Sequence, residues 1–284
     1  MSDAKVLAAG SALRQRTLTA FILGPLVLGA VLWLPAPGFA LFMALVVLIG
    51  AWEWAALSGV EARAARAAYV VLVAVGLGVL WLQPQWRPWL VAAGAAWWVI
   101  QTVLLARVQH IESRPGLDAV GAATGLLVLG VAWAALIELR AAVAAGPVLV
   151  LFLLLLIWFA DSAAYFAGRR WGRTKLAPAL SPGKTREGVY GALALAGVGG
   201  VLLGAVLAPG AGGLLLAVLV CVLTVAMSVV GDLYESLLKR RRGVKDSGQL
   251  LPGHGGFLDR IDSLTAAAPL FMLGITLLLP VVNT

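Results

Sequence analysis

The sequence predicts an all-α, polytopic integral membrane protein with about nine transmembrane helices and a cytoplasmic N-terminus. Three observations lead to this prediction: 62% of the 284 residues are hydrophobic, only 12% are charged, and the mean hydropathy is +0.98. A soluble domain carries about 25% charged and 45–50% apolar residues. Lipid tolerates no unpaired backbone, so the spans must be helices or a closed barrel, and continuous rather than alternating apolar stretches exclude the barrel.

Apolar stretches of roughly 20 residues, long enough to cross a bilayer, recur along the whole chain. A short polar segment, residues 1–17, precedes the first of them, and the others are separated by turns rich in Pro and Gly or by charged loops. The nine expected spans cover residues 18–34, 39–57, 67–82, 89–105, 119–139, 147–167, 189–207, 213–230 and 264–282.

The basic residues predict the orientation of these spans, because cytoplasmic loops carry an excess of Lys and Arg. With the N-terminus inside, nineteen of the 21 basic residues fall on the inner side and only Arg87 and Arg140 fall outside. We therefore expect a multi-pass protein of the cell inner (cytoplasmic) membrane. The same distribution explains the net charge of +8 by topology and anionic lipid head groups rather than by nucleic-acid binding.

Polar residues divide the chain into two regions. The N-terminal membrane region, residues 1–146, contains the first five spans. The C-terminal membrane region, residues 147–284, contains the other four and the two large polar loops, 168–188 and 231–263, both expected to face the cytoplasm. In the N-terminal region, Glu53 lies near the cytoplasmic end of a span, where a role in the site and a polar contact between helices are equally compatible with the sequence.

The longest polar stretch, residues 231–263, holds five of the thirteen acidic residues and lies between the last two expected spans. If the preceding span continues as a helix, the spacing i, i+3, i+4, i+7 places four polar side chains on one face: Asp232, Glu235, Ser236 and Lys239. Asp259 and Asp262 would share a face on a helix leading into the last span. A glycine-rich turn at 252–256 joins these two groups and lets the backbone approach a ligand.

Two acidic helix ends at one membrane surface indicate a site for a divalent cation. Carboxylate oxygens suit Mg²⁺, which usually keeps waters and substrate phosphates in its shell. The chain has one Cys and two His, so a zinc site is a poor fit. The alternatives are helix capping for Asp259 and Asp262, and lipid head-group binding for residues 239–242.

Asp161 lies within an expected span, about two turns or roughly 10 Å from its cytoplasmic end. A charged group in a span is costly, so it indicates a functional site. Asp161, Tyr165 and Gly168 share a face at i, i+4 and i+7. The alternative is an Asp paired with an Arg of its own loop.

The loop 181–188, which precedes the next span, combines glycine, hydroxyl groups and two cations. Such a loop suits a phosphate at a helix N-terminus. The P-loop pattern itself does not match, because Pro178 stands where its first glycine should be. The alternative is a basic loop that serves only to fix topology.

Three motifs resemble conserved blocks of the phosphatidate cytidylyltransferase (CDP-diacylglycerol synthase) family. The longest reads Ser236-x2-Lys239-Arg240-x4-Lys245-Asp246-x-Gly248-x3-Pro252-x-His254-Gly255-Gly256-x2-Asp259-Arg260-x-Asp262. The others are Asp161-Ser162-x-Ala164-Tyr165-x3-Gly168 and Ser181-Pro182-x-Lys184-Thr185-x-Glu187-Gly188. The resemblance covers about residues 150–284, and Gly183 replaces a residue that is often basic in the family.

The resemblance implies a transferase of phospholipid biosynthesis that converts CTP and phosphatidate into CDP-diacylglycerol and pyrophosphate with Mg²⁺, in one or two ions. It implies Asp232 and Asp259 as metal ligands, and Asp161 and Tyr165 as the wall of the site. The implied catalytic residues are Lys239, Arg240, Lys245, Asp246, His254, Arg260 and Asp262. The implied phosphate-binding residues are Ser181, Lys184, Thr185, Arg186 and Ser236. Membrane lipids are the other expected partners, no nucleic acid is expected, and we allow for a homodimer.

Two other classes of function compete with this interpretation. One is a lipid or polyprenol kinase that uses CTP. The other is a non-enzymatic lipid transporter or lipid-binding membrane protein, which should concentrate its polar groups at the middle of the bilayer. The D-x2-D-G-x2-A-R pattern of the CDP-alcohol phosphotransferases is absent from the sequence.

Overall fold

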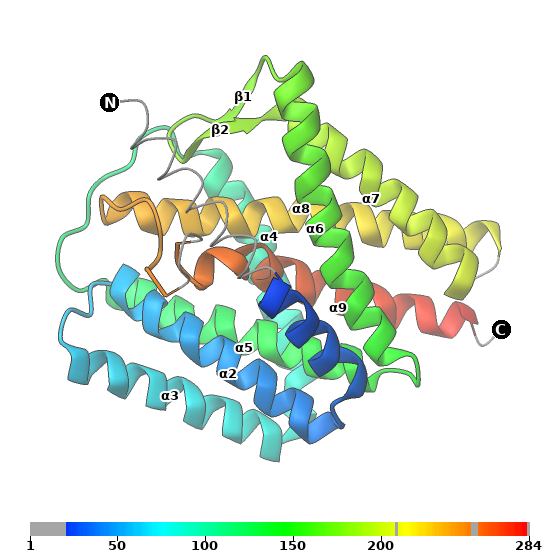
Figure 1. Cartoon of the computed structure of the whole chain (residues 1–284), viewed down its shortest axis with the longest axis horizontal. Coiled ribbons are helices and arrows are strands. Elements are labelled where there is room, and N and C mark those ends of the chain that lie inside the picture. The colour runs from blue at the N-terminus through cyan, green and yellow to red at the C-terminus, as the bar shows by residue number, and fades with distance from the viewer. Residues whose placement is uncertain (1–20, 208–209, 251–254, 283–284) are drawn as a thin grey trace.

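A computed structural model describes residues 21–207, 210–250 and 255–282 as a bundle of helices (Figure 1). Eight of these helices have the length and composition to cross a membrane. They are α2 (Ala36–Leu57), α3 (Arg63–Leu82), α4 (Arg87–Ala106), α5 (Ala119–Ala141), α6 (Gly146–Trp171), α7 (Arg186–Leu207), α8 (Ala211–Arg241) and α9 (Asp262–Val282). Two short 3₁₀ helices, η1 (Pro84–Trp86) and η2 (Leu258–Arg260), precede α4 and α9.

These helices confirm the all-α, polytopic prediction, and each contains one of the last eight expected spans. The first expected span begins outside the described residues, and its described part is the apolar helix Phe21–Trp33. The polar segment 1–17 also lies outside the described residues.

Several helices begin or end where the local sequence favours it. Proline occupies the first turn of α2, α4 and α6, where a missing N–H is tolerated. The side chain of Asp118 caps α5 by accepting a hydrogen bond from the backbone N–H of Gly121 at 2.9 Å. Basic residues fill the last turns of α6 and α8, where they complement the helix dipole.

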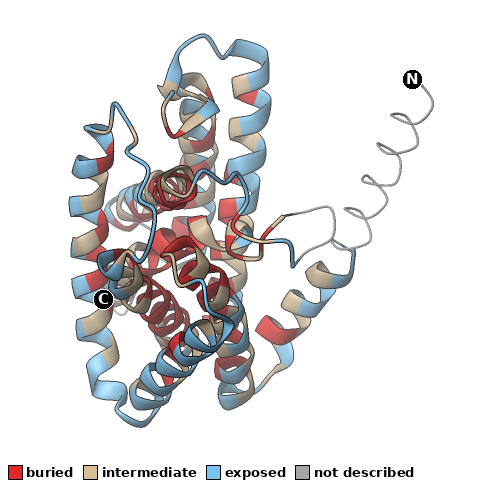
Figure 2. Cartoon of the chain, turned by 90° about the vertical axis from the view of Figure 1, so that its left-hand side faces the viewer, coloured by how far each residue is buried: buried red, intermediate tan, exposed pale blue. Residues whose placement is uncertain are grey.

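Helices α8 and α9 pack closely against each other, and α8 packs equally closely against α7. Gly200 and Gly204 of α7 allow this approach, since a Cβ at Gly200 would lie 2.4 Å from the Cα of Val218. Helix α5 joins the N-terminal helices to α9, whereas α3 lies at the edge and is the least buried span. Buried residues accordingly gather inside the bundle, and exposed residues line its outer helices (Figure 2).

Two elements differ from the sequence-based boundaries. Helix α8 continues to Arg241, eleven residues beyond the apolar run, because its polar residues are covered by neighbouring elements instead of facing water. The expected loop 168–188 begins with the last turn of α6 and then forms an antiparallel hairpin of β1 (Lys175–Ala177) and β2 (Ser181–Thr185), after which α7 starts at Arg186.

Candidate active site

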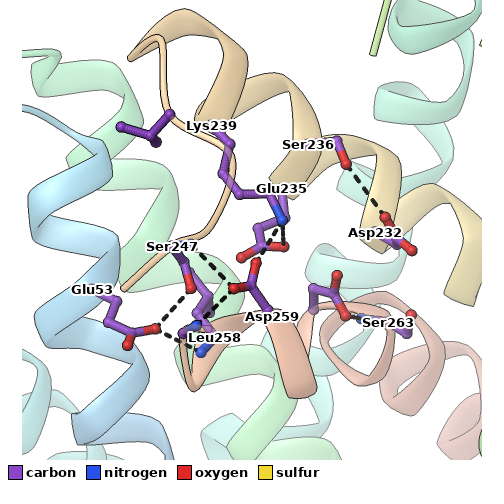
Figure 3. A network of polar contacts seen from close by, with 12 residues as sticks. Glu53, Asp232, Glu235, Ser236, Lys239, Ser247, Leu258, Asp259 and Ser263 are labelled. Atoms are coloured by element: carbon purple, nitrogen blue, oxygen red, sulfur yellow. Dashed lines mark hydrogen bonds and ion pairs between the residues drawn. The ribbon is translucent and has the colours of Figure 1, made fainter. Parts of the chain in front are cut away.

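The polar half of α8 lies beside the hairpin, the start of α9 and the chain segment that connects α8 to η2 (Figures 1 and 3). These elements bring together residues from two of the three motifs that the sequence singled out, and the third lies on α6. Two groups of contacts result, one around Lys239 and one around Asp232.

Lys239 forms the centre of a buried group of charges. Its Nζ lies 2.7 Å from Oε2 of Glu235, one turn earlier on α8, and 2.6 Å from Oδ1 of Asp259 in η2. The three side chains are 11%, 2% and 10% exposed, respectively. The other carboxylate oxygen of Glu235 is buried and has no hydrogen-bond partner among the residues that the structure describes. The sequence-based expectation that Glu235 and Lys239 share one face of a continued helix is therefore confirmed, and the pairing of Lys239 with Asp259 ties α8 to η2.

Asp259 is held by both of its carboxylate oxygens. While Oδ1 contacts Lys239, Oδ2 accepts hydrogen bonds from the backbone N–H groups of Ser247 at 3.1 Å and Gly256 at 2.9 Å. Burial acts to raise the pKa of Asp259, but the hydrogen bond and charge of Lys239, together with the two amides, hold this pKa below its ordinary value. Asp259 is therefore an anion that organises the connecting segment around itself.

Asp232 connects α8 to the hairpin. Its Oδ2 lies 2.5 Å from Nζ of Lys184 in β2, and its Oδ1 accepts a long hydrogen bond of 3.4 Å from the hydroxyl of Ser236. The side chains of Lys184 and Asp232 are each 29% exposed, so this ion pair remains accessible. The motif on the hairpin thus contacts α8 directly, one turn before the start of the longest motif at Ser236.

A cavity of about 420 Å³ opens beside the Lys184–Asp232 pair. It lies between α6, the hairpin, α7 and α8, and its lining includes Asp161, Tyr165, Lys184, Thr185, Ser228 and Asp232. Asp161 and Tyr165, which the sequence analysis assigned to the wall of the site, line this cavity from α6. The lining thus includes the carboxyl groups of Asp161 and Asp232 and the cations of Lys184 and Arg169, and much of the remainder is apolar.

Other predicted residues of the hairpin region make structural contacts. Arg240 donates from Nε to the carbonyl of Leu180 and from a terminal nitrogen to the carbonyl of Val244, both at 3.4 Å. The hydroxyl of Thr185 accepts from the backbone N–H of Gly188 at 3.2 Å, which caps the first turn of α7. Ser181 begins β2 and Arg186 begins α7.

The other predicted residues, which follow α8, are more scattered than the groups around Lys239 and Asp232. Lys245 and Asp246 are exposed, and Arg260 is exposed at the end of η2. Asp262 begins α9, and its Oδ1 accepts a hydrogen bond from the backbone N–H of the next residue, Ser263, at 2.6 Å. His254 lies outside the described residues.

Whether this site can bind Mg²⁺ depends on how its carboxylate groups are arranged. Among the described residues, no group of three or more Asp, Glu, His or Cys side chains is arranged to hold a metal ion. Mg²⁺ does not require such a group, because it is usually bound by one or two carboxylates together with substrate phosphates. An accessible carboxylate beside a cavity, as at Asp232, fits that mode of binding, whereas Asp259 is already engaged by Lys239 and two amides.

Comparison with known proteins extends the similarity beyond the C-terminal region. The sequence profile of the Cytidylyltransferase family matches residues 14–278. The chain belongs to this family. A protein from Pseudomonas aeruginosa named phosphatidate cytidylyltransferase is 44% identical over 259 residues, which cover 91% of this chain and 95% of the relative. Relatives with the same name from Haemophilus influenzae and Brucella suis are 36% and 37% identical, over 91% and 93% of this chain and 97% and 93% of the respective relatives.

The family match includes the N-terminal helices of this cytidylyltransferase, although the sequence motifs lie only in the C-terminal region. Glu53 of α2 forms one of several direct links between the two regions, because it is buried against the segment that connects α8 to η2. The sequence left the role of Glu53 open, and it gave no signal for its hydrogen-bond donor Ser247, which lies 194 residues further along the chain.

Proposed function

We propose that this cytidylyltransferase transfers the cytidylyl group of CTP to phosphatidate, which yields CDP-diacylglycerol and pyrophosphate. The observation that carries the proposal is the similarity, over more than nine-tenths of this chain, to relatives named phosphatidate cytidylyltransferase. The site is compatible with it, because a lysine and several carboxylates lie beside a cavity among helices that can span a membrane.

The surroundings of the cavity suit a substrate that is half lipid. Phe159 and Phe166 on α6 and Tyr190 on α7 are large, exposed side chains on the helices that flank it. Acyl chains can lie along such a surface while the phosphate reaches the cation of Lys184. We place the protein in the cytoplasmic membrane with this site toward the cytoplasm, where CTP is present, because the basic residues favour that orientation.

In the proposed reaction, an oxygen of the phosphatidate phosphate attacks the α-phosphorus of CTP. The new P–O bond forms as the bond from the α-phosphorus to the bridging oxygen of the β-phosphate breaks, and pyrophosphate leaves with that electron pair. The attacking oxygen is already largely deprotonated at neutral pH, so the reaction needs no strong general base. Catalysis then consists of positioning and of neutralising phosphate charge.

The residues of this chain divide these tasks. Lys184 has the accessible ammonium group beside the cavity, and we assign it to a substrate phosphate. Asp232 would hold Mg²⁺ together with substrate phosphates, whereas the second predicted ligand, Asp259, is engaged by Lys239 and two backbone amides. When bound, Mg²⁺ would neutralise charge on the phosphates of CTP. Lys239 keeps Asp259 and Glu235 in fixed positions through its two ion pairs.

The test uses the purified full-length protein in detergent micelles with Mg²⁺, phosphatidate and CTP that is labelled on the α-phosphate. The expected products are labelled CDP-diacylglycerol and unlabelled pyrophosphate, and diacylglycerol in place of phosphatidate should give none. Absence of label in lipid would refute the proposal. Transfer of a γ-phosphate label to lipid would instead indicate a kinase, and lipid binding without turnover would indicate a transporter or lipid-binding protein.

A further inference from the structure

Glu53 is a buried carboxylate on α2, outside the motifs that contain the proposed catalytic residues. It is 3% exposed, and its side chain points toward the segment between α8 and η2 (Figure 3). Its Oε2 accepts hydrogen bonds from the hydroxyl of Ser247 and the backbone N–H of Leu258, both at 2.8 Å. Its Oε1 accepts from the backbone N–H of Phe257 at 3.0 Å. One carboxylate thus receives three hydrogen bonds.

These donors lie at both ends of the connecting segment. Ser247 follows the end of α8 closely, whereas Phe257 and Leu258 immediately precede or begin η2. Ser247 also donates its backbone N–H to Asp259, which in turn contacts Lys239. A continuous series of contacts therefore runs from α2, through the two ends of the segment, to the charged group on α8.

The segment is built to approach Glu53 closely. A Cβ at Gly248 would lie 2.2 Å from Oε1 of Glu53, and one at Gly256 would lie 2.8 Å from Oε2 of Glu53 and 1.9 Å from the hydroxyl of Ser247. Side chains at these two positions would therefore displace the segment from the carboxylate. In the described part of the chain no ion pair to Glu53 is found, so neutral donors hold it. Hydrogen bonds to a carboxylate are stronger than those between neutral groups.

From this geometry we infer that Glu53 is a positioning residue, which fixes the segment that carries Asp259 and thereby sets the placement of Asp259 and Lys239 for phosphate transfer. The inference rests on the proposed function for its catalytic consequence. It also gives the N-terminal region a specific task, since α2 supplies an anchor that the C-terminal motifs lack.

The inference is tested first without activity, by hydrogen–deuterium exchange of the full-length protein in detergent. In Glu53→Gln, an amide N–H replaces one acceptor oxygen and faces the donors of the segment. We expect exchange in peptides that contain Phe257 and Leu258 to rise by at least about tenfold, while peptides of α5 and the apolar half of α8 stay as in the wild type. Unchanged exchange at Phe257 and Leu258 would overturn the inference.

The second measurement is the steady-state kinetics of Glu53→Gln and of two milder variants, Ser247→Ala and Glu53→Asp. Misplacement of reacting groups by about 1 Å can cost on the order of 10²-fold in rate. We therefore expect kcat of Glu53→Gln to fall by about that factor, with the KM for CTP within about threefold of the wild type. Ser247→Ala removes one of the three hydrogen bonds, and Glu53→Asp keeps the charge with a shorter reach. Both should fall between the wild type and Glu53→Gln in exchange and in kcat.

Glu61→Gln is the matched control, because Glu61 is an exposed carboxylate shortly after α2. It should leave both exchange and kcat unchanged. Faster exchange in Glu53→Gln with wild-type kcat would show that the anchor does not serve catalysis. If Glu53→Gln does not fold, Ser247→Ala decides the matter in the same two measurements. If the wild-type protein forms no CDP-diacylglycerol, the proposed function fails, while the exchange measurement still tests the anchor.

Discussion

Replacement of Asp232 by Asn separates catalysis from stability more cleanly than any other change at the site. The variant keeps the size of the side chain and one acceptor oxygen, replaces the other oxygen by an NH₂ donor, and removes the charge. The structure limits the cost in stability, because the ion pair to Lys184 joins side chains that are each 29% exposed. Such pairs contribute about 0.2–1 kcal/mol, and the long 3.4 Å contact to Ser236 adds little. We expect a loss of no more than about 1 kcal/mol, or roughly 2–4 °C in Tm.

The expected effect on turnover is much larger. Loss of a ligand to a charge-neutralising metal, or of one group that stabilises the transition state, costs about 10²–10³-fold in kcat. The assay follows transfer of α-labelled CTP into lipid for the wild type, Asp232→Asn and the control Glu112→Gln, with Tm measured on the same preparations. Glu112 is exposed in the loop before α5 and should behave like the wild type. Wild-type turnover of Asp232→Asn would refute the role of Asp232, and a fall of more than about 10 °C in Tm would refute the stability argument.

Three further predictions follow from the same contacts. Lys239→Met leaves the carboxylates of Glu235 and Asp259 buried without their cation, so the free energy of unfolding should fall by about 3–5 kcal/mol, measured by denaturant titration; an unchanged midpoint would contradict the buried ion pairs. Gly248→Ala places a Cβ 2.2 Å from Oε1 of Glu53 and should cost about 1–3 kcal/mol, whereas Gly183→Ala, which meets nothing within 4 Å, should leave Tm unchanged; equal Tm values for the two variants would count against the close packing. Chelation of Mg²⁺ should stop turnover, and added Mg²⁺ should restore it, because the proposed neutralisation of CTP requires the ion; turnover that persists in excess chelator would disprove this requirement.

The fold could be predicted from the sequence where one physical constraint acts along the chain. Apolar length alone located the spans that became α2 to α9. The polar face of α8 was also predictable, because Asp232, Glu235, Ser236 and Lys239 occur at helical spacing, and the helix does continue through them. The hairpin was not, since Pro178, Pro182 and Gly183 interrupt any alternating strand pattern and its position depends on contacts with α8.

The sequence predicted which residues belong to the candidate site better than it predicted the contacts between them. The family resemblance implied a catalytic role for Lys239, and the structure pairs its ammonium group with the carboxylates of Glu235 and Asp259. Glu235 lies four residues from Lys239 on the same helix, so helical spacing predicts this pair. Asp259 reaches Lys239 only after the chain reverses direction, so spacing on one helix does not predict it. The partners of Glu53 are further still, at separations of 194, 204 and 205 residues, and no local pattern in one sequence reports such contacts.

Those separations also affect how the protein is made. Glu53 enters the membrane region early in synthesis, when α8, η2 and α9 do not yet exist, and contacts between distant parts of a chain form late. Until residues 247–258 follow, its carboxylate lacks the three hydrogen-bond donors that Ser247, Phe257 and Leu258 supply. The hydrogen bonds to Glu53 therefore form only near the end of synthesis. A chain truncated before residue 247 can contain the first helices but lacks every donor of these hydrogen bonds.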